Sequence, residues 1–218
     1  MRGLVRVGAA VPSLALGNVK ENMKRHLAMM REAKEKHVSI VTFPELSLTG
    51  YTCGDLFFQR RLLDDVTDAL LALKDEMPEG ILAVVGAPLE IEGALYNCAV
   101  VLHKGEIISA VPKTFLPNNG EFYEKRWFQS GDARRDASVA IPKLKTDVCR
   151  QAIFETEDGV RFGIELCEDL WAPLPPSTML SVEGAEIILN LSASNELLSK
   201  REYRQQLISQ QSARCQCG

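Results

Sequence analysis

The chain alternates short runs of β-branched residues with amphipathic stretches from its beginning to its end. Apolar residues recur at helical spacing over residues 19–36 and 62–77, whereas compact apolar runs at 38–43, 81–86 and 185–191 predict buried strands. Helices and strands that alternate in this way predict an α/β domain, in which helices cover a sheet.

Two glycine-centred turns predict antiparallel strands within this pattern. Residues 95–111 form two apolar runs around Gly105, and residues 152–166 form two around Gly159. Glycine takes the positive φ that tight hairpin turns require, so each stretch predicts a β-hairpin and the sheet is expected to be mixed. Residues 117–150 contain many Gly, Pro and Asn residues and are expected to form an irregular substrate loop.

Size and charge limit the classes of partner. The 218 residues have 46% hydrophobic content, which is enough for one substantial core, so we expect a single domain. A net charge of -4 gives no basic excess for binding nucleic acid or an anionic membrane. We see no secretory signal and no membrane span, and we expect a cytoplasmic protein. The polar helix expected at 200–213 is either a subunit contact or a solvated surface.

The cysteines and histidines do not predict a metal site. The three histidines lie far apart, and Cys215 and Cys217 are the one close cysteine pair, whereas structural zinc usually needs four ligands. A chain of this length does not need disulfides for stability, so we expect reduced thiols.

Three reactive side chains each follow a predicted strand: Glu45, Lys113 and Cys167. A cysteine needs a base to act as a nucleophile, and Glu45 can supply one. Lys113 and the backbone N–H of Glu168 can stabilise the oxyanion that attack on an amide creates. Glu121 can hold the lysine charged or share the proton transfers, although an acid there could simply begin a helix. Alone, each residue has an ordinary structural explanation; together they predict one catalytic site.

At these positions the sequence resembles the carbon–nitrogen hydrolase (nitrilase) superfamily, whose Glu, Lys and Cys occur in this chain order. The matching segments are residues 43–45, 112–113 and 166–168. Further segments resemble the glutaminase domain of glutamine-dependent NAD synthetases: residues 116–118, 121–128, 167–171 and 190–194.

The resemblance implies a four-layer α-β-β-α sandwich with mixed sheets that hydrolyses glutamine through a thioester on Cys167. It also implies glutamine contacts by Tyr51, Glu168, Trp171 and Ser194, although aromatic residues and serines at strand ends are often structural. Asn119 stands where many members have a tyrosine that contacts substrate, so a different glutamine contact is expected there.

The family's domain continues beyond the length of this chain and is followed by an ATP-dependent synthetase domain. We therefore expect residues 1–218 to be a glutaminase domain that is incomplete at its C-terminus and lacks its last strands. The resemblance implies that the domain itself needs no cofactor, that ATP, Mg²⁺ and deamido-NAD belong to a synthetase domain outside residues 1–218, and that the protein is a homo-oligomer. Two alternatives stay open: a free-standing amidase or nitrilase that acts on another small amide, and a catalytically incompetent fragment.

Overall fold

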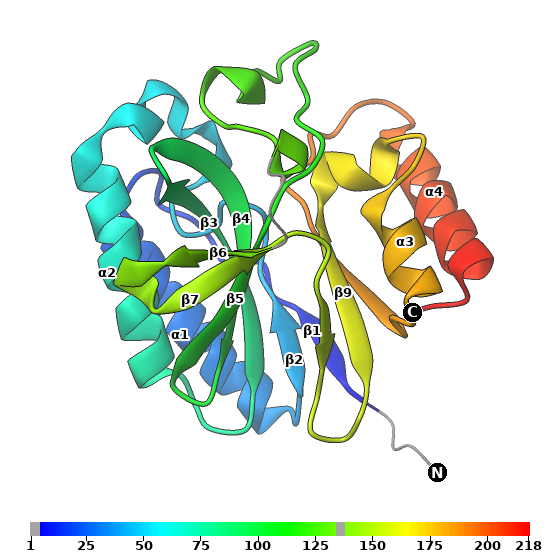
Figure 1. Ribbon diagram of the computed structural model, residues 1–218, viewed down its shortest axis with the longest axis horizontal. Helices are drawn as coiled ribbons and strands as arrows, with labels where there is room; N and C mark the ends of the chain where they lie inside the picture. The colour runs from blue at the N-terminus through cyan, green and yellow to red at the C-terminus, as the bar shows by residue number, and fades with distance from the viewer. Residues whose placement is uncertain (1–4, 134–137) are drawn as a thin grey trace.

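A computed structural model describes residues 5–133 and 138–218 of the chain and contains two β-sheets and four α-helices (Figure 1). The larger sheet has the strand order β1-β2-β3-β4-β5-β7-β6, with these bounds: β1 Val7–Ala9, β2 Ile40–Thr42, β3 Leu82–Ile91, β4 Ala94–His103, β5 Glu106–Pro112, β6 Ser138–Ile141 and β7 Thr146–Cys149. The smaller sheet has the order β10-β9-β8, with these bounds: β8 Ile153–Glu155, β9 Arg161–Leu166 and β10 Ile187–Leu191.

Both sheets are mixed, as the sequence predicts. In the large sheet, β2 pairs in parallel with β1 and β3, and β4 pairs antiparallel with β3 and β5. In the small sheet, β9 pairs in parallel with β10 but antiparallel with β8. Gly105 and Gly159 have φ values of 76° and 77°, so the two predicted hairpins turn where glycine permits a left-handed backbone. The α/β class and the mixed pairing are therefore confirmed.

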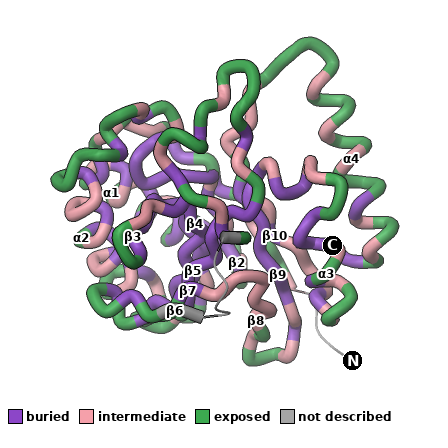
Figure 2. The backbone as a smooth tube through the Cα atoms, turned by 45° about the horizontal axis from the view of Figure 1, so that its top comes forward, coloured by how far each residue is buried: buried purple, intermediate pink, exposed green. Residues whose placement is uncertain are grey.

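The helices lie on the outer sides of the two sheets. Helices α1 (Val19–Glu35) and α2 (Arg60–Glu76) pack against the large sheet, whereas α3 (Pro176–Val182) packs on β9 and α4 (Lys200–Cys215) packs on α3. In Figure 1, α1 and α2 lie on the left and α3 and α4 on the right, with the strands between them. The most deeply buried parts of the chain follow the central strands (Figure 2).

Two apolar cores correspond to this arrangement. One lies between α1, α2 and the large sheet and contains Leu27 and Leu70. The other joins the sheets, with Val101 of β4 packed in one cluster with Phe162 and Ile164 of β9. Because the apolar side chains of β9 lie in the inter-sheet core, the end of β9 is fixed relative to the large sheet.

The structure differs from the sequence predictions in two places. Residues 117–150 are not wholly irregular, since β6 and β7 form a hairpin there and β7 extends the large sheet beside β5. Helix α3 was not predicted; Pro176 begins it, and proline is favoured in the first turn because its missing N–H has no helical partner. The helix expected at 200–213 is present as α4, whose buried Gln211 donates from its amide to Ser177 Oγ on α3 at 2.9 Å.

None of the helices in residues 5–133 and 138–218 combines the length and apolar character that a membrane crossing requires. The six cysteines are free thiols. Within the same ranges, no group of three or more His, Cys, Asp and Glu side chains could hold a metal ion.

Candidate active site

Cys167 lies at a sharp elbow directly after β9. It is buried and begins a 3-10 turn, Cys167–Trp171. Its φ of 42° is in the left-handed region, which residues other than glycine seldom occupy. Such strained positions persist where the surrounding structure holds them, and they are frequent at active sites. Cys167 thus directly follows a strand, as its position after an apolar run indicates, and the backbone turns sharply at the cysteine itself.

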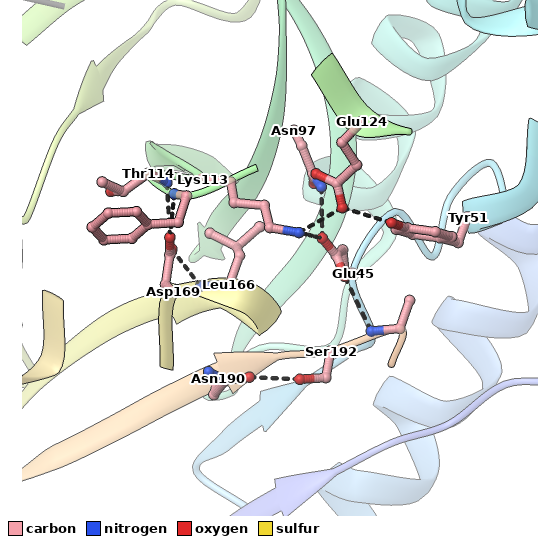
Figure 3. A network of polar contacts seen from close by, with 12 residues as sticks. Glu45, Tyr51, Asn97, Lys113, Thr114, Glu124, Leu166, Asp169, Asn190 and Ser192 are labelled. Atoms are coloured by element: carbon pink, nitrogen blue, oxygen red, sulfur yellow. Dashed lines mark hydrogen bonds and ion pairs between the residues drawn. The ribbon is translucent and has the colours of Figure 1, made fainter. Parts of the chain in front are cut away.

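Glu45 and Lys113 form a buried ion pair, although 68 positions separate them in the chain. The ammonium Nζ of Lys113 lies 2.5 Å from Oε1 of Glu45. The amide Nδ2 of Asn97 donates to the same oxygen at 2.7 Å, and the backbone N–H of Ala193 donates to Oε2 at 3.1 Å (Figure 3). Donors from three other chain segments thus fix the orientation of the Glu45 carboxylate.

Glu124, and not Glu121, is the second carboxylate at the lysine. Glu124 is 1% exposed, and its Oε1 lies 2.6 Å from Lys113 Nζ and accepts a hydrogen bond from the Tyr51 hydroxyl at 2.7 Å. Glu121 is exposed to solvent. The prediction that Glu121 supports the lysine is therefore corrected, because the turn Glu124–Arg126 directs the later glutamate inward.

Asp169 connects the nucleophile elbow to the segment after Lys113. Its Oδ2 accepts the N–H of Leu166 at 2.9 Å, and its Oδ1 accepts the N–H groups of Thr114 and Phe115 at 3.0 and 2.7 Å. These bonds hold the backbone on either side of Cys167 against the backbone that follows Lys113. Burial raises the pKa of Asp169 to about 7 despite these donors.

The charges of the cluster determine the resting protonation states. Burial and the carboxylate of Glu45 raise the pKa of the Cys167 thiol to about 12, although Lys113 opposes them. Burial disfavours the charged form of Lys113, but Glu45 and Glu124 outweigh it and raise its pKa. At neutral pH the lysine is therefore an ammonium and the cysteine a neutral thiol. Burial and Glu45 also raise the pKa of Glu124.

The predicted substrate residues occupy different positions around this cluster. Tyr51 is half-buried and is bonded to Glu124, so its hydroxyl is part of the carboxylate network. Trp171 stacks on Tyr203 with ring centroids 5.5 Å apart, and Lys200 Nζ lies 5.2 Å from the Trp171 ring centre. Ser194 is half-buried and Asn119 is exposed.

Glu168 and Trp171 lie together in a pocket of about 420 Å³. The pocket also contains Lys125, so it presents charges of both signs. Its lining includes Thr114 and Glu168, the chain neighbours of Lys113 and Cys167, but none of the three predicted catalytic residues. A larger hollow of about 620 Å³ between the starts of α1 and α2 is lined by none of the predicted site residues.

The sequence predictions missed three residues of this site: Asn97, Glu124 and Asp169. Asn97 is the one amide within the apolar run of β4, and a polar residue buried in a strand needs a partner. Glu124 precedes Phe128 by four positions, so helical periodicity would direct the two side chains to one side. No comparable signal marks Asp169, since both Glu168 and Asp169 follow the cysteine.

Comparison with known proteins places the chain in a family. Residues 6–217 match the family model described as carbon-nitrogen hydrolase. The chain belongs to the carbon–nitrogen hydrolase family. The resemblance stated from the sequence segments is thus confirmed.

The curated relatives of this carbon–nitrogen hydrolase include glutamine-dependent NAD(+) synthetases. That of Mycobacterium tuberculosis is 37% identical over 216 residues, which cover 98% of this chain and 32% of the relative. That of Arabidopsis thaliana is 34% identical over 197 residues, which cover 85% of this chain and 27% of the relative. The chain therefore spans about a third or less of the length of these relatives.

Solved structures give the same fold. A glutamine-dependent NAD(+) synthetase from Cytophaga hutchinsonii superposes with a TM-score of 0.86 at 29% identity, covering 98% of this chain and 34% of that one. An amidase from Nesterenkonia sp. superposes with a TM-score of 0.77 at 16% identity, covering 98% and 73% of the two chains. At that identity the amidase shows the shared fold alone.

Proposed function

We propose that this carbon–nitrogen hydrolase releases ammonia from the side-chain amide of glutamine through a thioester on Cys167. The observation that carries the proposal is the buried Lys113 ammonium, which lies 2.5 Å from Glu45 and 2.6 Å from Glu124 beside a cysteine at a strained elbow. A base, a fixed cation and a nucleophile are the groups that amide hydrolysis needs.

In the first half of the reaction, Cys167 Sγ forms a bond to the amide carbon while Glu45 accepts the thiol proton. The oxyanion that results is stabilised by the Lys113 ammonium and the N–H of Glu168. Glu45 then donates the proton to the amide nitrogen, the carbon–nitrogen bond breaks, and ammonia leaves a γ-glutamyl thioester on the cysteine.

In the second half, water attacks the thioester carbon and Glu45 accepts a proton from that water. The carbon–sulfur bond breaks, the sulfur regains a proton from Glu45, and glutamate is released. Because the thiol pKa is about 12, a free thiolate is scarce at neutral pH and proton transfer must accompany attack. The carboxylate of Glu45 is suited to this role because Lys113, Asn97 and the N–H of Ala193 restrain it.

Glutamine is favoured as the substrate by the pocket next to the cluster. An α-amino acid head group is zwitterionic, and the pocket contains both Glu168 and Lys125. We propose that Glu168 faces the α-ammonium group, with Trp171, Tyr51 and Ser194 nearby, and that exposed Asn119 contributes less.

The relatives suggest where the ammonia goes. They are named glutamine-dependent NAD(+) synthetases, and this chain spans about a third of their length. We propose that the ammonia serves ATP-dependent amidation of deamido-NAD by a synthetase domain, where ATP and Mg²⁺ would bind. Assembly as a homo-oligomer and a cytoplasmic location stay predictions.

The substrate is tested by measuring ammonia release from glutamine, asparagine, propionamide and butyramide with equal amounts of protein. Glutamine is expected to be hydrolysed most efficiently, because only it places a zwitterionic head group at the correct distance from its amide. Turnover of a simple amide with glutamine inert would favour the free-standing amidase, and no turnover of any amide would favour the incompetent fragment.

A further inference from the structure

Asp55 joins the chain segment that carries Glu124 to the segment that carries Tyr51. Asp55 lies in the 3-10 turn Tyr51–Phe58. Arg126 donates from Nε to Oδ1 at 2.7 Å and from Nη2 to Oδ2 at 2.8 Å, and Trp127 Nε1 donates to Oδ1 at 2.9 Å. One carboxylate therefore receives three hydrogen bonds from residues 71 and 72 positions away.

The donors of these bonds, Arg126 and Trp127, follow Glu124 closely in the chain. The N–H groups of Trp127 and Phe128 both donate to the carbonyl of Glu124, at 3.0 and 2.9 Å, so the turn is short and closed. The Tyr51 hydroxyl and the Glu124 carboxylate point toward one another in Figure 3. Besides ring contacts of Phe57, the two segments thus meet at the Tyr51–Glu124 bond and at the exposed Asp55 carboxylate.

The surroundings of Glu124 do not favour its charged form. Burial and the nearby Glu45 both raise its pKa, and among the described residues its Oε2 has no hydrogen-bond partner. A buried carboxylate next to another carboxylate is costly unless it is fully paired. Glu124 therefore depends on its backbone being fixed in place.

We propose that Asp55, Arg126 and Trp127 are positioning residues that hold the Glu124 carboxylate against Lys113. The expected effect on the reactivity of Cys167 rests on the proposed function. The expected effect on the backbone beside Glu124 does not. Hydrogen bonds from Arg126 and Trp127 lower the pKa of Asp55, so the carboxylate that accepts these bonds is ionised at neutral pH.

The Asp55–Arg126 pair is solvent-exposed, so it can position Glu124 without contributing much to the stability of the whole fold. The side chains of Asp55 and Arg126 are 61% and 43% exposed, and surface ion pairs of this kind add little to global stability. The segment keeps its apolar contacts, since the Phe57 ring lies 5.0 Å from that of Phe128 and 5.9 Å from that of Trp127. Loss of the Asp55 charge should therefore leave the fold intact and disturb the local geometry.

The test compares Asp55→Asn with Asp65→Asn in the full chain. Asp65 pairs with Arg61 on the surface of α2 and is a matched control, because the Arg61 Nε bonds to its two oxygens at 2.9 and 3.0 Å. The readouts are the rate at which a diazo-ketone analogue of glutamine modifies Cys167, the hydrogen exchange of the amides at 127 and 128, and the unfolding temperature.

Asp55→Asn is expected to slow modification of Cys167 by about tenfold, because small misplacements of a reacting group have effects of this size. It should also speed exchange at 127 and 128 while the unfolding temperature stays close to that of the wild type. Asp65→Asn should match the wild type in all three. In a Glu124→Gln background, Asp55→Asn should cause no further kinetic loss, since its effect acts through Glu124.

An Asp55→Asn variant that matches the wild type in exchange and in rate overturns the proposal, as does a full additional tenfold loss in the Glu124→Gln background. If the wild type itself is not modified at Cys167, the proposed function fails. The exchange rates then decide the structural claim: faster exchange in Asp55→Asn alone supports it, and equal exchange in both variants overturns it.

Discussion

The Cys167 thiol lies among charges of both signs, and their balance explains why the site needs a base. Glu45 raises the thiol pKa and Lys113 lowers it, while burial adds to the effect of the glutamate. At neutral pH the site therefore contains a neutral thiol, and in the proposed mechanism the thiolate forms as Glu45 accepts the proton.

Glu45→Gln should separate thiol acidity from catalysis. Removal of the negative charge leaves Lys113 as the dominant neighbour, so the pKa of Cys167 should fall. Modification of Cys167 by iodoacetamide should then begin at lower pH than in the wild type, whose rate should still rise toward pH 12. Glutamine hydrolysis should fall by about a hundredfold or more, because the proton acceptor is lost.

The control is Cys167→Ala, in which iodoacetamide should leave this position unmodified. An unchanged pH profile in Glu45→Gln would show that the glutamate does not act on the thiol. Full glutaminase activity in that variant would remove Glu45 from the mechanism.

The two glutamates of the segment after Lys113 should differ sharply on substitution. Glu124→Gln removes a carboxylate 2.6 Å from the lysine Nζ and should lower kcat by about tenfold or more. Glu121→Gln changes an exposed side chain and should leave kcat within about twofold of the wild type. Steady-state ammonia release from glutamine measures both, and equal losses would contradict the assignment of Glu124.

The same pair shows what the sequence could and could not predict at single residues. Glu45, Lys113 and Cys167 follow compact apolar runs, so their places at strand ends could be predicted. Glu121 and Glu124 lie in a segment whose one periodic signal is the spacing of Glu124 and Phe128, and choosing between the two glutamates needs the direction of one short turn. That direction depends on contacts with Asp55 and Tyr51, which are distant in sequence.

At the scale of the elements, close approach of the backbone places the Glu45 segment on the large sheet. A Cβ on Gly86 of β3 would lie 2.3 Å from the carbonyl oxygen of Pro44 and 2.4 Å from the backbone nitrogen of Leu46. Contacts of that length with backbone atoms cannot be relieved by a side-chain rotation. The strand can therefore carry only glycine where the Glu45 turn crosses it.

Gly86→Ala should displace the Glu45 turn. We expect a loss of about 1–3 kcal/mol in the free energy of unfolding. Glutaminase activity of the folded variant should also fall, because the Glu45 carboxylate is displaced. Gly8→Ala is the control, because the three atoms nearest to its Cβ would all belong to the Val38 side chain, the closest at 3.2 Å. Urea unfolding and ammonia release report the two effects, and a Gly86→Ala variant as active as Gly8→Ala would contradict the close approach.

Elements with strong periodicity could be predicted, whereas those fixed by distant contacts could not. Helices α1 and α2 follow from apolar spacing, and the hairpins at Gly105 and Gly159 follow from their glycine turns. The β6–β7 hairpin and α3 are short, and prolines and polar residues interrupt them. Their formation depends on pairing with β5 and packing on β9, which no local pattern shows.

At the scale of the whole molecule, a buried histidine links stability to pH. His26 of α1 bonds the Asn22 carbonyl and the Ser47 hydroxyl, and burial lowers its pKa to about 4. The unfolded chain has a histidine pKa near 6.5, so it binds a proton at a higher pH than the folded chain does. The contribution of His26 is present at neutral pH and is lost as the pH falls from about 6.5 to 4.

His26→Gln should therefore flatten the acid side of the stability profile. The difference in unfolding free energy between wild type and variant should shrink by roughly 3 kcal/mol from pH 7 to pH 4. The raised pKa of Asp169 favours the folded state as the pH falls, which is opposite to the effect of His26. Asp169 is present in both proteins, so its contribution cancels in the difference. His37→Asn, at an exposed left-handed position, is the control, and parallel wild-type and His26→Gln profiles would contradict the assignment.

The central claim is a nucleophilic Cys167, and covalent labelling by a diazo-ketone analogue of glutamine tests it most directly. Intact mass and peptide mapping of the folded protein should show one adduct, on the peptide that contains Cys167. Cys167→Ala should show none, and the other five cysteines should stay unmodified. Folded wild-type protein without an adduct, or with the adduct on another cysteine, would contradict the account.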